Sequence, residues 1–400
     1  MKQGWQIKKL GDLYPLKTGK TPSRGDNSLW DTKKVSNNLW VSIADISANE
    51  GKAIIDTKEY ISDKACDKFP LVPEGALLIS FKLSLGRMSF AGRALRTNEA
   101  ILSLVPIPEI NHRFLYYYFL YFDWDKAAEG DVKVKGKTLN QKKLAEIPIL
   151  YPSLSEQQRI VALLDAEFAK IDALKANAEK NLQNAKDLFQ AALKKELEPK
   201  DGWERTTLQE ICTHIVDCPH TTPIKSPSKT EYPCIRTSEL KNGEISWETM
   251  QYVEKSEYLK RVSRLVPQEN DIVYGREGTF GDAILIPNYY HFCLGQRTML
   301  FRPNQELVIP RFLLLYVISP YVYDQAKAKN TGCGVGHVNV RDIKEFSINL
   351  PQINVQQSIV ARLDALNEKC KTLQANYEMT LSLCDDLKQA LLRKAFNGEL

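Results

Sequence analysis

The sequence predicts an α+β fold in which two mixed α/β globular regions are separated by two long helices that form an antiparallel intramolecular coiled coil. The first observation behind this prediction is a repeat, because residues 151–197 match residues 350–396 without a gap at 21 of 47 positions. The second is an apolar stripe with helical spacing in both copies. The third is a similar order of short strand-like and helical runs before each copy. A duplication at a fixed long offset is typical of a scaffold that presents two related surfaces.

The repeat divides the chain into four segments. The globular regions are residues 1–150 and 201–349, and the long helices lie within residues 151–200 and 350–400. At 400 residues the chain is too long for one ordinary domain. The sequence therefore predicts a pseudo-two-fold protein rather than a single compact domain.

Each globular region mixes strand-like and helical segments. Short apolar runs predict strands, and these are Leu77–Ser80 and Ile101–Val105 in the first region and Asp271–Tyr274, Ala283–Ile286 and Thr298–Phe301 in the second. Longer apolar runs predict helices at Phe114–Phe122 and Arg311–Tyr321.

The two copies of the repeat are predicted to be helices over residues 155–197 and 354–396. Apolar residues recur there at steps of three and four, which is typical of a coiled-coil seam. Ser155 and Asn354 are the candidate N-caps, and Asn397-Gly398 is expected to end the second helix. Because each stripe needs a partner, two stripes of equal length predict that the helices pair with each other, and a pseudo-two-fold axis makes the pair antiparallel. A helix of about 42 residues is about 60 Å long.

Composition limits the classes of protein to consider. No apolar run is long enough to span a membrane and the first residues lack the apolar core of a signal peptide, so a cytoplasmic location is expected. The net charge is +5 overall. Residues 1–150 carry 23 Lys and Arg against 17 Asp and Glu, whereas residues 201–350 carry 17 against 18. The first region is therefore compatible with nucleic acid, and the second would have to gather its basic side chains on one face.

Motifs for catalysis are missing from the sequence. Gly19-Lys20-Thr21 ends like a phosphate-binding loop, but Tyr14 stands where that motif needs a glycine. The chain also lacks the sequence motifs of zinc proteases, serine hydrolases and amino-methyltransferases. We therefore expect a non-catalytic protein that binds no cofactor of its own. A zinc-binding module built on Cys212, His214, Cys218, His220 and Cys234 remains an alternative, although the spacings fit no common zinc motif.

The remaining polar residues suit contacts with DNA. Glycines around Arg276 would let an arginine approach a guanine edge, and the alternative is a surface arginine in a turn. Alternating lysines near residue 135 would follow phosphates, or would form a solvated strand edge. The full set of DNA-binding candidates is Lys17, Thr18, Lys20, Thr21, Lys82, Arg87, Lys133, Lys135, Lys137, Asn140, His220, Thr221, Thr222, Arg236, Arg276, Thr279, His337 and Asn339.

The chain resembles the specificity subunits of type I restriction-modification systems over essentially its whole length. The residues that carry the resemblance are Ile147-Pro148-Ile149, the run from Leu154 to Val161, the closing run from Ala390 to Leu400, and the Gly-Trp pairs at Gly4-Trp5 and Gly202-Trp203. One departure is that Val355 stands before the second Gln-Gln pair, where the family has an acidic residue.

The resemblance implies two target recognition domains that each read one part of a split DNA site, with the coiled coil as the ruler of the spacer. It also implies two methyltransferase subunits that bring S-adenosylmethionine, and two restriction subunits that use ATP and Mg. The residues at the ends of the helices that would dock the methyltransferase subunits are Gln157, Gln158, Arg159, Gln356, Gln357, Arg393, Lys394 and Phe396. Rival interpretations are a two-headed adaptor that binds proteins instead of DNA, and a fused enzyme with its own methyltransferase.

Overall fold

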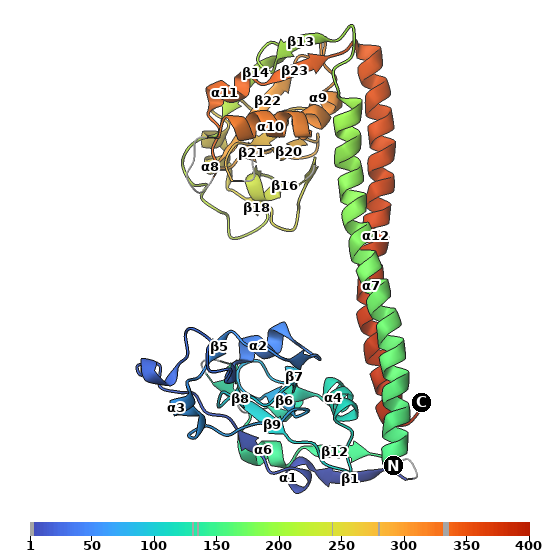
Figure 1. Cartoon of the computed structure of the whole chain (residues 1–400). Coiled ribbons are helices and arrows are strands. Elements are labelled where there is room, and N and C mark those ends of the chain that lie inside the picture. The colour runs from blue at the N-terminus through green and yellow to red at the C-terminus, as the bar shows by residue number, and fades with distance from the viewer. Residues whose placement is uncertain (1–3, 130–131, 134–135, 242, 279–280, 331–335) are drawn as a thin grey trace. The chain divides into compact units, whose positions relative to one another are not determined.

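The computed structural model describes residues 4–129, 132–133, 136–241, 243–278, 281–330 and 336–400. The chain forms two compact units (Figure 1). Unit 1 contains residues 1–177 and 380–400, and unit 2 contains residues 178–379. Each unit therefore combines one globular region with parts of both long helices. No helix in the described ranges is both long and apolar enough to cross a bilayer.

Unit 1 is built on a five-stranded sheet with the order β2-β9-β6-β7-β4. Its strands are β2 (Lys17–Thr18), β9 (Ile101–Leu104), β6 (Leu77–Ser80), β7 (Met88–Ala91) and β4 (Ala53–Ile54). The two strands predicted from the sequence are thus confirmed, and the second ends one residue earlier than expected. A smaller three-stranded sheet contains β5 (Glu59–Tyr60), β3 (Leu39–Val41) and β8 (Arg96–Thr97). Two strand pairs complete the unit, β1 (Gln6–Lys9) with β12 (Pro148–Tyr151) and β10 (Val132–Lys133) with β11 (Gly136–Lys137).

Helix α4 (His112–Tyr121) supplies much of the core of unit 1. Asn111 caps it, because its side chain accepts hydrogen bonds from the backbone N–H groups of Arg113 and Phe114. The shorter helices of this unit are α1 (Leu10–Leu13), α2 (Ile43–Ala48), α3 (Asp63–Cys66), α5 (Trp124–Ala127) and α6 (Gln141–Ala145), with a 3₁₀ turn at Asn27–Leu29.

Burial of His112 makes the stability of unit 1 sensitive to acid. Its Nε2 lies 3.2 Å from the Tyr14 hydroxyl and its Nδ1 lies 3.1 Å from the carbonyl oxygen of Gly75. Loss of solvation lowers the pKa of His112 below its usual 6.5, so the folded state favours the neutral ring. The unfolded state then binds more protons as the pH falls below about 6.5, and the free energy of unfolding should fall by up to about 1.4 kcal/mol per pH unit.

Urea unfolding between about pH 7.5 and about pH 5.5 measures this effect. The fluorescence of Trp5, Trp30, Trp40 and Trp124 reports on unit 1 once Trp203 and Trp247 of unit 2 are changed to Phe. His112→Gln should flatten the pH dependence, whereas His214→Gln, on an exposed strand position, should not. Equal slopes for wild type and His112→Gln would contradict the assignment.

Unit 2 repeats this plan with a four-stranded antiparallel sheet of order β14-β22-β19-β20. Its strands are β14 (Cys212–Asp217), β22 (Thr298–Pro303), β19 (Ile272–Gly275) and β20 (Ala283–Leu285), so all three strands predicted from the sequence are confirmed within a residue or two. A smaller three-stranded sheet contains β18 (Gln251–Tyr252), β15 (Pro233–Ile235) and β21 (Cys293–Leu294). Two strand pairs complete the unit, β13 (Glu204–Thr207) with β23 (Ser347–Leu350) and β16 (Leu240–Lys241) with β17 (Glu244–Ile245).

The helix predicted at Arg311–Tyr321 is in fact two helices, α9 (Pro310–Val317) and α10 (Pro320–Ala328). Pro320 causes the break, because a proline lacks the N–H that would continue α9 and its fixed φ suits the first turn of a new helix. Unit 2 also contains α8 (Lys255–Arg261), α11 (Val340–Lys344) and a 3₁₀ turn at Thr237–Glu239.

The two long helices are α7 (Leu154–Glu196) and α12 (Ile353–Asn397), of 43 and 45 residues. Both begin one residue before the predicted start, so the predicted caps were wrong. The backbone N–H of Glu156 donates to the hydroxyl of Ser153 at 3.4 Å, and the N–H groups of Val355 and Gln356 donate to the carbonyl oxygen of Gln352. Gly398, with a φ of +74°, follows the end of α12 as predicted.

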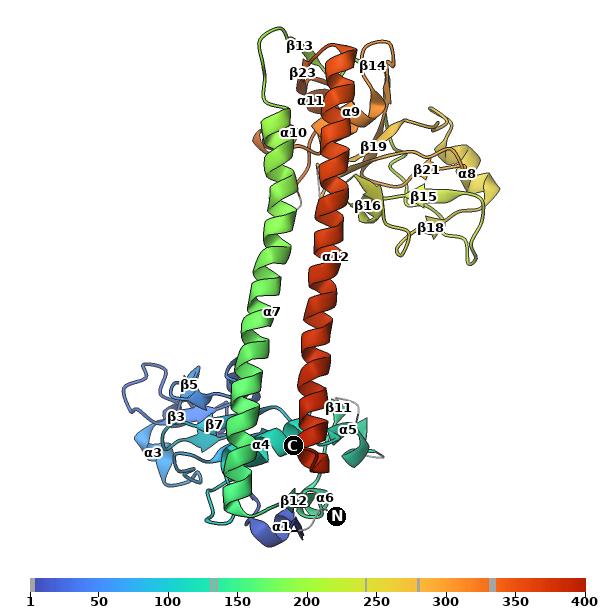
Figure 2. The ribbon, with the colours of Figure 1, turned by 90° about the vertical axis from the view of Figure 1, so that its right-hand side faces the viewer.

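The contacts of the long helices show that they run antiparallel. In unit 1, the start of α7 (Ile160 and Leu164) shares a buried cluster with the end of α12 (Leu392 and Phe396). In unit 2, the end of α7 (Phe189 and Leu193) and the next residue, Leu197, share a cluster with the start of α12 (Ile359, Leu363 and Cys370). Figure 2 shows the two helices side by side. The predicted fold class is therefore confirmed.

Candidate functional site

Three loops of unit 2 meet at one end of its main sheet. The antiparallel register pairs Asp217 with Met299, Gly275 with Thr298 and Tyr274 with Ala283. The loop after β14, the loop after β19 and the residues before β22 therefore lie at the same edge. This edge brings together His220, Thr221 and Thr222 with Arg276, although they are more than 50 residues apart in sequence.

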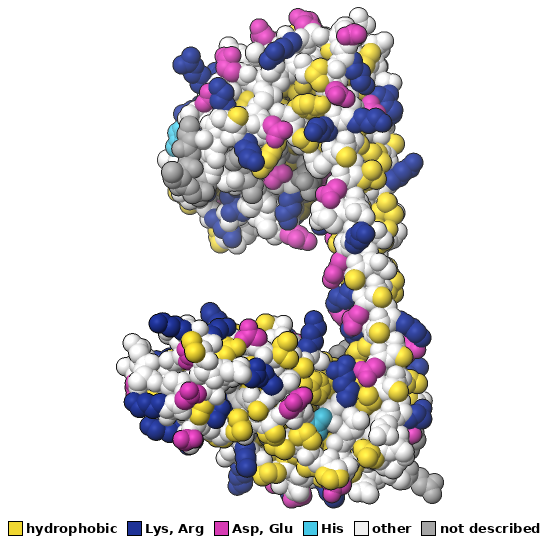
Figure 3. All heavy atoms as spheres, in the orientation of Figure 1, with side chains coloured by type: hydrophobic (Ala, Val, Ile, Leu, Met, Phe, Trp, Pro, Cys, Tyr) yellow, Lys and Arg dark blue, Asp and Glu magenta, His cyan; other side chains and the backbone are white. Residues whose placement is uncertain are grey.

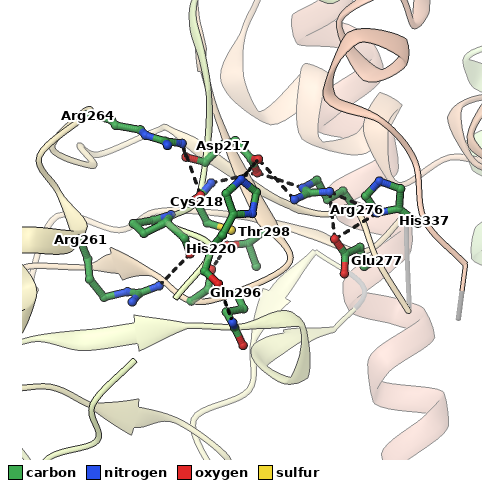
Figure 4. Close-up of polar contacts among 12 residues, drawn as sticks. Asp217, Cys218, His220, Arg261, Arg264, Arg276, Glu277, Gln296, Thr298 and His337 are labelled. Atoms are coloured by element: carbon green, nitrogen blue, oxygen red, sulfur yellow. Dashed lines mark hydrogen bonds and ion pairs between the residues drawn. The ribbon is translucent and has the colours of Figure 1, made fainter. Parts of the chain in front are cut away.

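Arg276 lies between two carboxylates at the base of these loops (Figure 4). Its Nε donates to Oδ1 of Asp217 at 2.9 Å, and its NH1 lies 3.0 Å from Oε1 of Glu277. Only 5% of its side chain is exposed. The predicted direct contact with a guanine would require these ion pairs to open, since a buried cation needs its partners. The observed role of Arg276 is to connect the loop after β14 to the loop after β19.

Glu277 extends this network to His337. The Nδ1 atom of His337 lies 3.0 Å from Oε1 of Glu277, and Nε of Arg297 lies 3.4 Å from Oε2 of the same carboxylate. Glu277 and His337 also form an isolated β-bridge. The loop before α11 is therefore attached to the same edge, and it carries Asn339, whose side chain lies 3.4 Å from Asp342. Thr279, another predicted contact residue, lies outside the described residues.

His220 is an accessible ionisable side chain at this edge. Its Nε2 lies 3.3 Å from Oδ2 of Asp217, and 67% of its side chain is exposed, compared with 13% for Asp217. Thr221 and Thr222 are exposed beside it. These exposed side chains carry ring nitrogens and hydroxyl groups, which are of the kinds that contact base edges or phosphates, and the hydroxyl of Thr222 also donates to Oε1 of Gln296 at 3.4 Å.

Two further residues reach the edge from the smaller sheet of unit 2. Strands β15 and β21 are parallel, so Arg236 and Gln296 follow them on the same side. The N–H of Gly295 donates to the carbonyl oxygen of Ile235 at 2.6 Å, and a Cβ at residue 295 would lie 2.8 Å from that oxygen, so only glycine allows this approach. Arg236 is held by Glu239, with NH2 2.6 Å from Oε1. Gln296 was not predicted, since no local pattern in the sequence distinguishes it.

Unit 1 gathers its predicted residues in the same way. Thr18 pairs with Leu102, Ser80 with Ile101, and Ile79 with Met88. The loop after β2, the loop between β6 and β7 and the residues before β9 therefore share one edge of the sheet. A bridge between Lys82 and Thr138 adds the segment before α6. The residues brought together here are Lys17, Thr18, Lys20, Thr21, Lys82, Arg87 and Asn140.

The loop after β2 is fixed through its backbone. The N–H of Lys20 donates to the carbonyl oxygen of Thr97 at 2.9 Å, and its own carbonyl oxygen accepts from Nε1 of Trp40 at 3.0 Å. The side chains of Lys17 and Lys20 are exposed. The hydroxyl of Thr21 donates to Glu99. A rigid backbone with exposed lysines suits contact with phosphates.

Other predicted residues of unit 1 have local partners or cannot be described. Arg87 forms an ion pair with Glu50. Asn140 caps α6 by accepting from the N–H of Lys143 at 2.9 Å. The backbones of Lys133 and Lys137 belong to the β10–β11 hairpin, and Lys135 lies outside the described residues.

Gln157 and Gln356 are buried clamps rather than surface docking residues, which corrects the sequence prediction for both. Gln157 accepts from the N–H of Asn111 at 2.8 Å and donates to the carbonyl oxygens of Glu109 and Pro152, both at 3.0 Å. Gln356 makes the same three bonds with Ile309, Leu307 and Pro351 at 2.8, 3.0 and 2.8 Å. Both side chains are fully buried, so neither is available to a partner.

Phe396 is also buried, which corrects its prediction as a docking residue. Its ring packs against Phe114 and Tyr118, each with centroids 5.4 Å apart. The other predicted docking residues are exposed, and these are Gln158, Arg159, Gln357, Arg393 and Lys394. Arg159 also donates to the carbonyl oxygen of Leu400 at 2.9 Å, so it joins the start of α7 to the end of the chain.

The cysteine-histidine cluster does not assemble a metal centre in the structure. Among the residues that the structure describes, no group of three or more His, Cys, Asp or Glu side chains is placed to hold a metal. Burial raises the pKa of Cys212 to about 12, which disfavours the thiolate that zinc binds. Cys234 lies opposite Cys293 in the parallel register of β15 and β21, and both are free thiols.

The chain thus consists of two similar mixed domains, each with polar loops at one edge of its main sheet, and one pair of antiparallel helices. The family of the type I restriction modification DNA specificity domain matches residues 2–184 and 200–379. The chain therefore belongs to the family of type I restriction-modification specificity subunits, and its role is in DNA sequence specificity.

Relatives and solved structures agree with this assignment. The chain is 23% identical to the Escherichia coli type I restriction enzyme EcoBI specificity subunit, over 86% of this chain and 77% of that protein. It is also 23% identical to the MjaIX specificity subunit of Methanocaldococcus jannaschii, over 99% of this chain and 93% of that protein. Its fold matches a chain of a solved type I R-M system with a TM-score of 0.79 at 17% identity, covering 100% of this chain and 99% of that one. The HsdS subunit from Thermoanaerobacter tengcongensis matches with a TM-score of 0.57 at 16% identity, covering 100% of this chain and 98% of that one.

Proposed function

We propose that this chain recognises a bipartite DNA target, with one half-site read by the loop edge of each unit, and that it docks two methyltransferase subunits and through them two restriction subunits. The observation that best supports this proposal is that both units place their candidate loops at one edge of the main sheet. The same frame presents His220, Thr221 and Thr222 in unit 2, but Lys20 and Thr21 in unit 1. Different side chains on the same frame are what two unlike half-sites require.

Each edge offers two kinds of side chain, those that bind phosphates and those that can distinguish bases. Exposed lysines such as Lys17 and Lys20 neutralise phosphates and hold the protein on the duplex. Imidazole, hydroxyl and amide groups at His220, Thr222 and Gln296 are of the kinds that distinguish base pairs in the major groove. The chemistry of the complex then belongs to the partner subunits, which carry S-adenosylmethionine, ATP and Mg.

The attachment of each globular region to its helix supports a fixed spacing between half-sites. The buried Gln157 and Gln356 clamps join the start of each long helix to the segment before α4 or α9. An ion pair reinforces each joint, with Arg113 Nε 3.0 Å from Asp165 and Arg311 NH2 2.7 Å from Asp364. Because each globular region is joined to one of two paired helices, we infer that the length of these helices sets the spacer between the half-sites.

The docking surface for the methyltransferase subunits is assigned to exposed apolar and basic side chains on the helices. In unit 1, Leu174, Leu383 and Leu387 are about half exposed, at 50%, 53% and 48%. Exposed apolar side chains are visible along the helices in Figure 3. Arg393 and Lys394 lie further along α12. An exposed apolar stripe with a polar surround is typical of a surface that binds a partner helix.

Selection from a random duplex DNA library tests the proposal. The chain of residues 1–400, expressed together with methyltransferase subunits of the same system, should retain one split sequence with a fixed spacer. Mapping methylated bases in the host genome should yield the same sequence. Salt-insensitive binding without any preferred sequence would refute the proposal and favour a two-headed adaptor for proteins.

Neutralising an exposed lysine of the unit 1 edge should weaken binding without changing the target. Lys20→Gln should lower the slope of log K against log salt by about 1, because one phosphate contact is lost. Lys8→Gln is the matched control, since Lys8 is exposed but lies in the separate β1–β12 pair. Titration of the selected duplex at several salt concentrations gives both slopes. A Lys20→Gln slope equal to that of Lys8→Gln would remove Lys20 from the interface.

A further inference from the structure

The reading loop of unit 2 rests on a buried arginine that belongs to another element. Arg261 is the last residue of α8, and only 1% of its side chain is exposed. Figure 4 shows its guanidinium group directed at the backbone of the loop that carries His220. Arg261 lies about 40 residues from this loop in sequence, with separations of 40 and 42 residues to Thr221 and Pro219.

The guanidinium group of Arg261 binds two loops at once. Its NH1 donates to the carbonyl oxygen of Thr221 at 3.2 Å, and its NH2 donates to that of Pro219 at 3.3 Å. Its Nε donates to the carbonyl oxygen of Leu294 at 2.6 Å, directly before the Gly295-Gln296 loop. Glu257 supplies the counter-charge at 3.3 Å. The planar fork of arginine is needed for this pattern, since the single ammonium of lysine cannot bind three carbonyl groups so far apart.

Neighbouring groups bind the remaining carbonyls of the loop. Gln296 Nε2 donates to the carbonyl oxygen of His220 at 2.9 Å, and Arg264 NH1 donates to that of Asp217 at 3.1 Å. The carbonyl groups of residues 217, 219, 220 and 221 are therefore all bound by the protein. The loop is consequently held through its backbone, while the side chains of His220, Thr221 and Thr222 remain exposed.

We propose that Arg261 is the positioning residue for the second half-site, and that it holds residues 218–222 in the shape that reads DNA before DNA binds. The proposal rests on the proposed function and deepens it. A loop that is already ordered loses little conformational entropy on binding, and it fixes the direction of each donor relative to the bases. Arg261 itself would touch no base, because only 1% of its side chain is exposed.

A specific pattern of defects follows from this role. Arg261→Lys keeps the charge beside Glu257 but leaves loop carbonyls without a donor. Discrimination at the bases of the second half-site should fall about tenfold or more. Discrimination at the first half-site and the salt dependence of non-specific binding should stay unchanged, because phosphate contacts do not depend on the shape of this loop.

Arg302→Lys is the matched control. Arg302 also pairs with a buried carboxylate, Asp271, at 2.7 Å and donates to a backbone carbonyl, that of Val266, at 2.8 Å. It lies near the far end of β22, away from the reading loops. This variant should lose stability in a similar way but keep its discrimination at both half-sites.

The experiment compares wild type and variants, each as the chain of residues 1–400 expressed together with methyltransferase subunits of the same system, on a random duplex DNA library. If wild type selects no split sequence, the proposed function fails. If wild type selects one and Arg261→Lys keeps its second half-site within about twofold, the positioning role of Arg261 is overturned. If Arg261→Lys does not fold, the variants His220→Ala and Gln296→Ala test the proposal instead. Both change side chains of the loops that Arg261 holds. Intact second half-site discrimination in both of these variants would also overturn the proposal.

Discussion

Inserting seven residues into each long helix is expected to lengthen the unspecified spacer of the DNA target by about three base pairs, with both half-sites unchanged. Seven residues make two helical turns, so the apolar stripes of α7 and α12 stay in register with each other. The added length is about 10.5 Å, and duplex DNA rises about 3.4 Å per base pair. Suitable positions are between Asn177 and Ala178 in α7 and between Met379 and Thr380 in α12, where the two units divide.

Selection from a random duplex library reads the spacer directly. The control is the same insertion in α7 alone, which leaves α12 without matching length and should impair folding instead of lengthening the spacer. An unchanged spacer in the double insertion, with both half-sites intact, would show that the helices do not set the separation of the readers.

Replacing Gln157 by Met should lower the free energy of unfolding of unit 1 by about 2–4 kcal/mol. Methionine fills a similar volume but makes none of the three hydrogen bonds of the clamp, so the N–H of Asn111 and the carbonyls of Glu109 and Pro152 lose their partner. Gln356→Met should have the same effect on unit 2. Urea unfolding followed through the tryptophans of one unit at a time separates the two results.

Gln158→Met is the matched control for the clamp. Gln158 is the next residue in the same helical turn, but its side chain is exposed. Its replacement should change the free energy of unfolding by less than about 0.5 kcal/mol. Equal stabilities for Gln157→Met and Gln158→Met would show that the buried bonds of Gln157 contribute nothing.

The features that follow local rules could be predicted from the sequence. The long helices were found because the apolar period of α7 and α12 continues for about 40 residues, which no strand or loop sustains. Strand β6 was found because a short apolar run marks a fully buried strand. The caps were misplaced by two residues, because Ser153, Ser155, Gln352 and Asn354 all offer plausible oxygens near the helix start.

The candidate site could be predicted only in part, because its side chains are placed by long-range pairing. The sequence places several candidate residues in loops that follow strands, but it does not show that these loops share one edge of a sheet. No local pattern indicates that Arg276 turns inward to Asp217, 59 residues away. Arg261 and Gln296 were missed for the same reason, since their partners are backbone carbonyls of a distant loop. A single sequence does not distinguish a buried arginine from an exposed one.

The twin glutamine clamps have an evolutionary consequence. Each joint uses the same side chain, the same three backbone groups and a following arginine–aspartate pair. A gene segment that encodes one globular region would therefore bring with it the backbone groups and the arginine that join this region to either helix. On the proposed function, recombination between such genes would exchange one half-site in a single event, and the host genome would then be methylated at new positions by unchanged partner subunits.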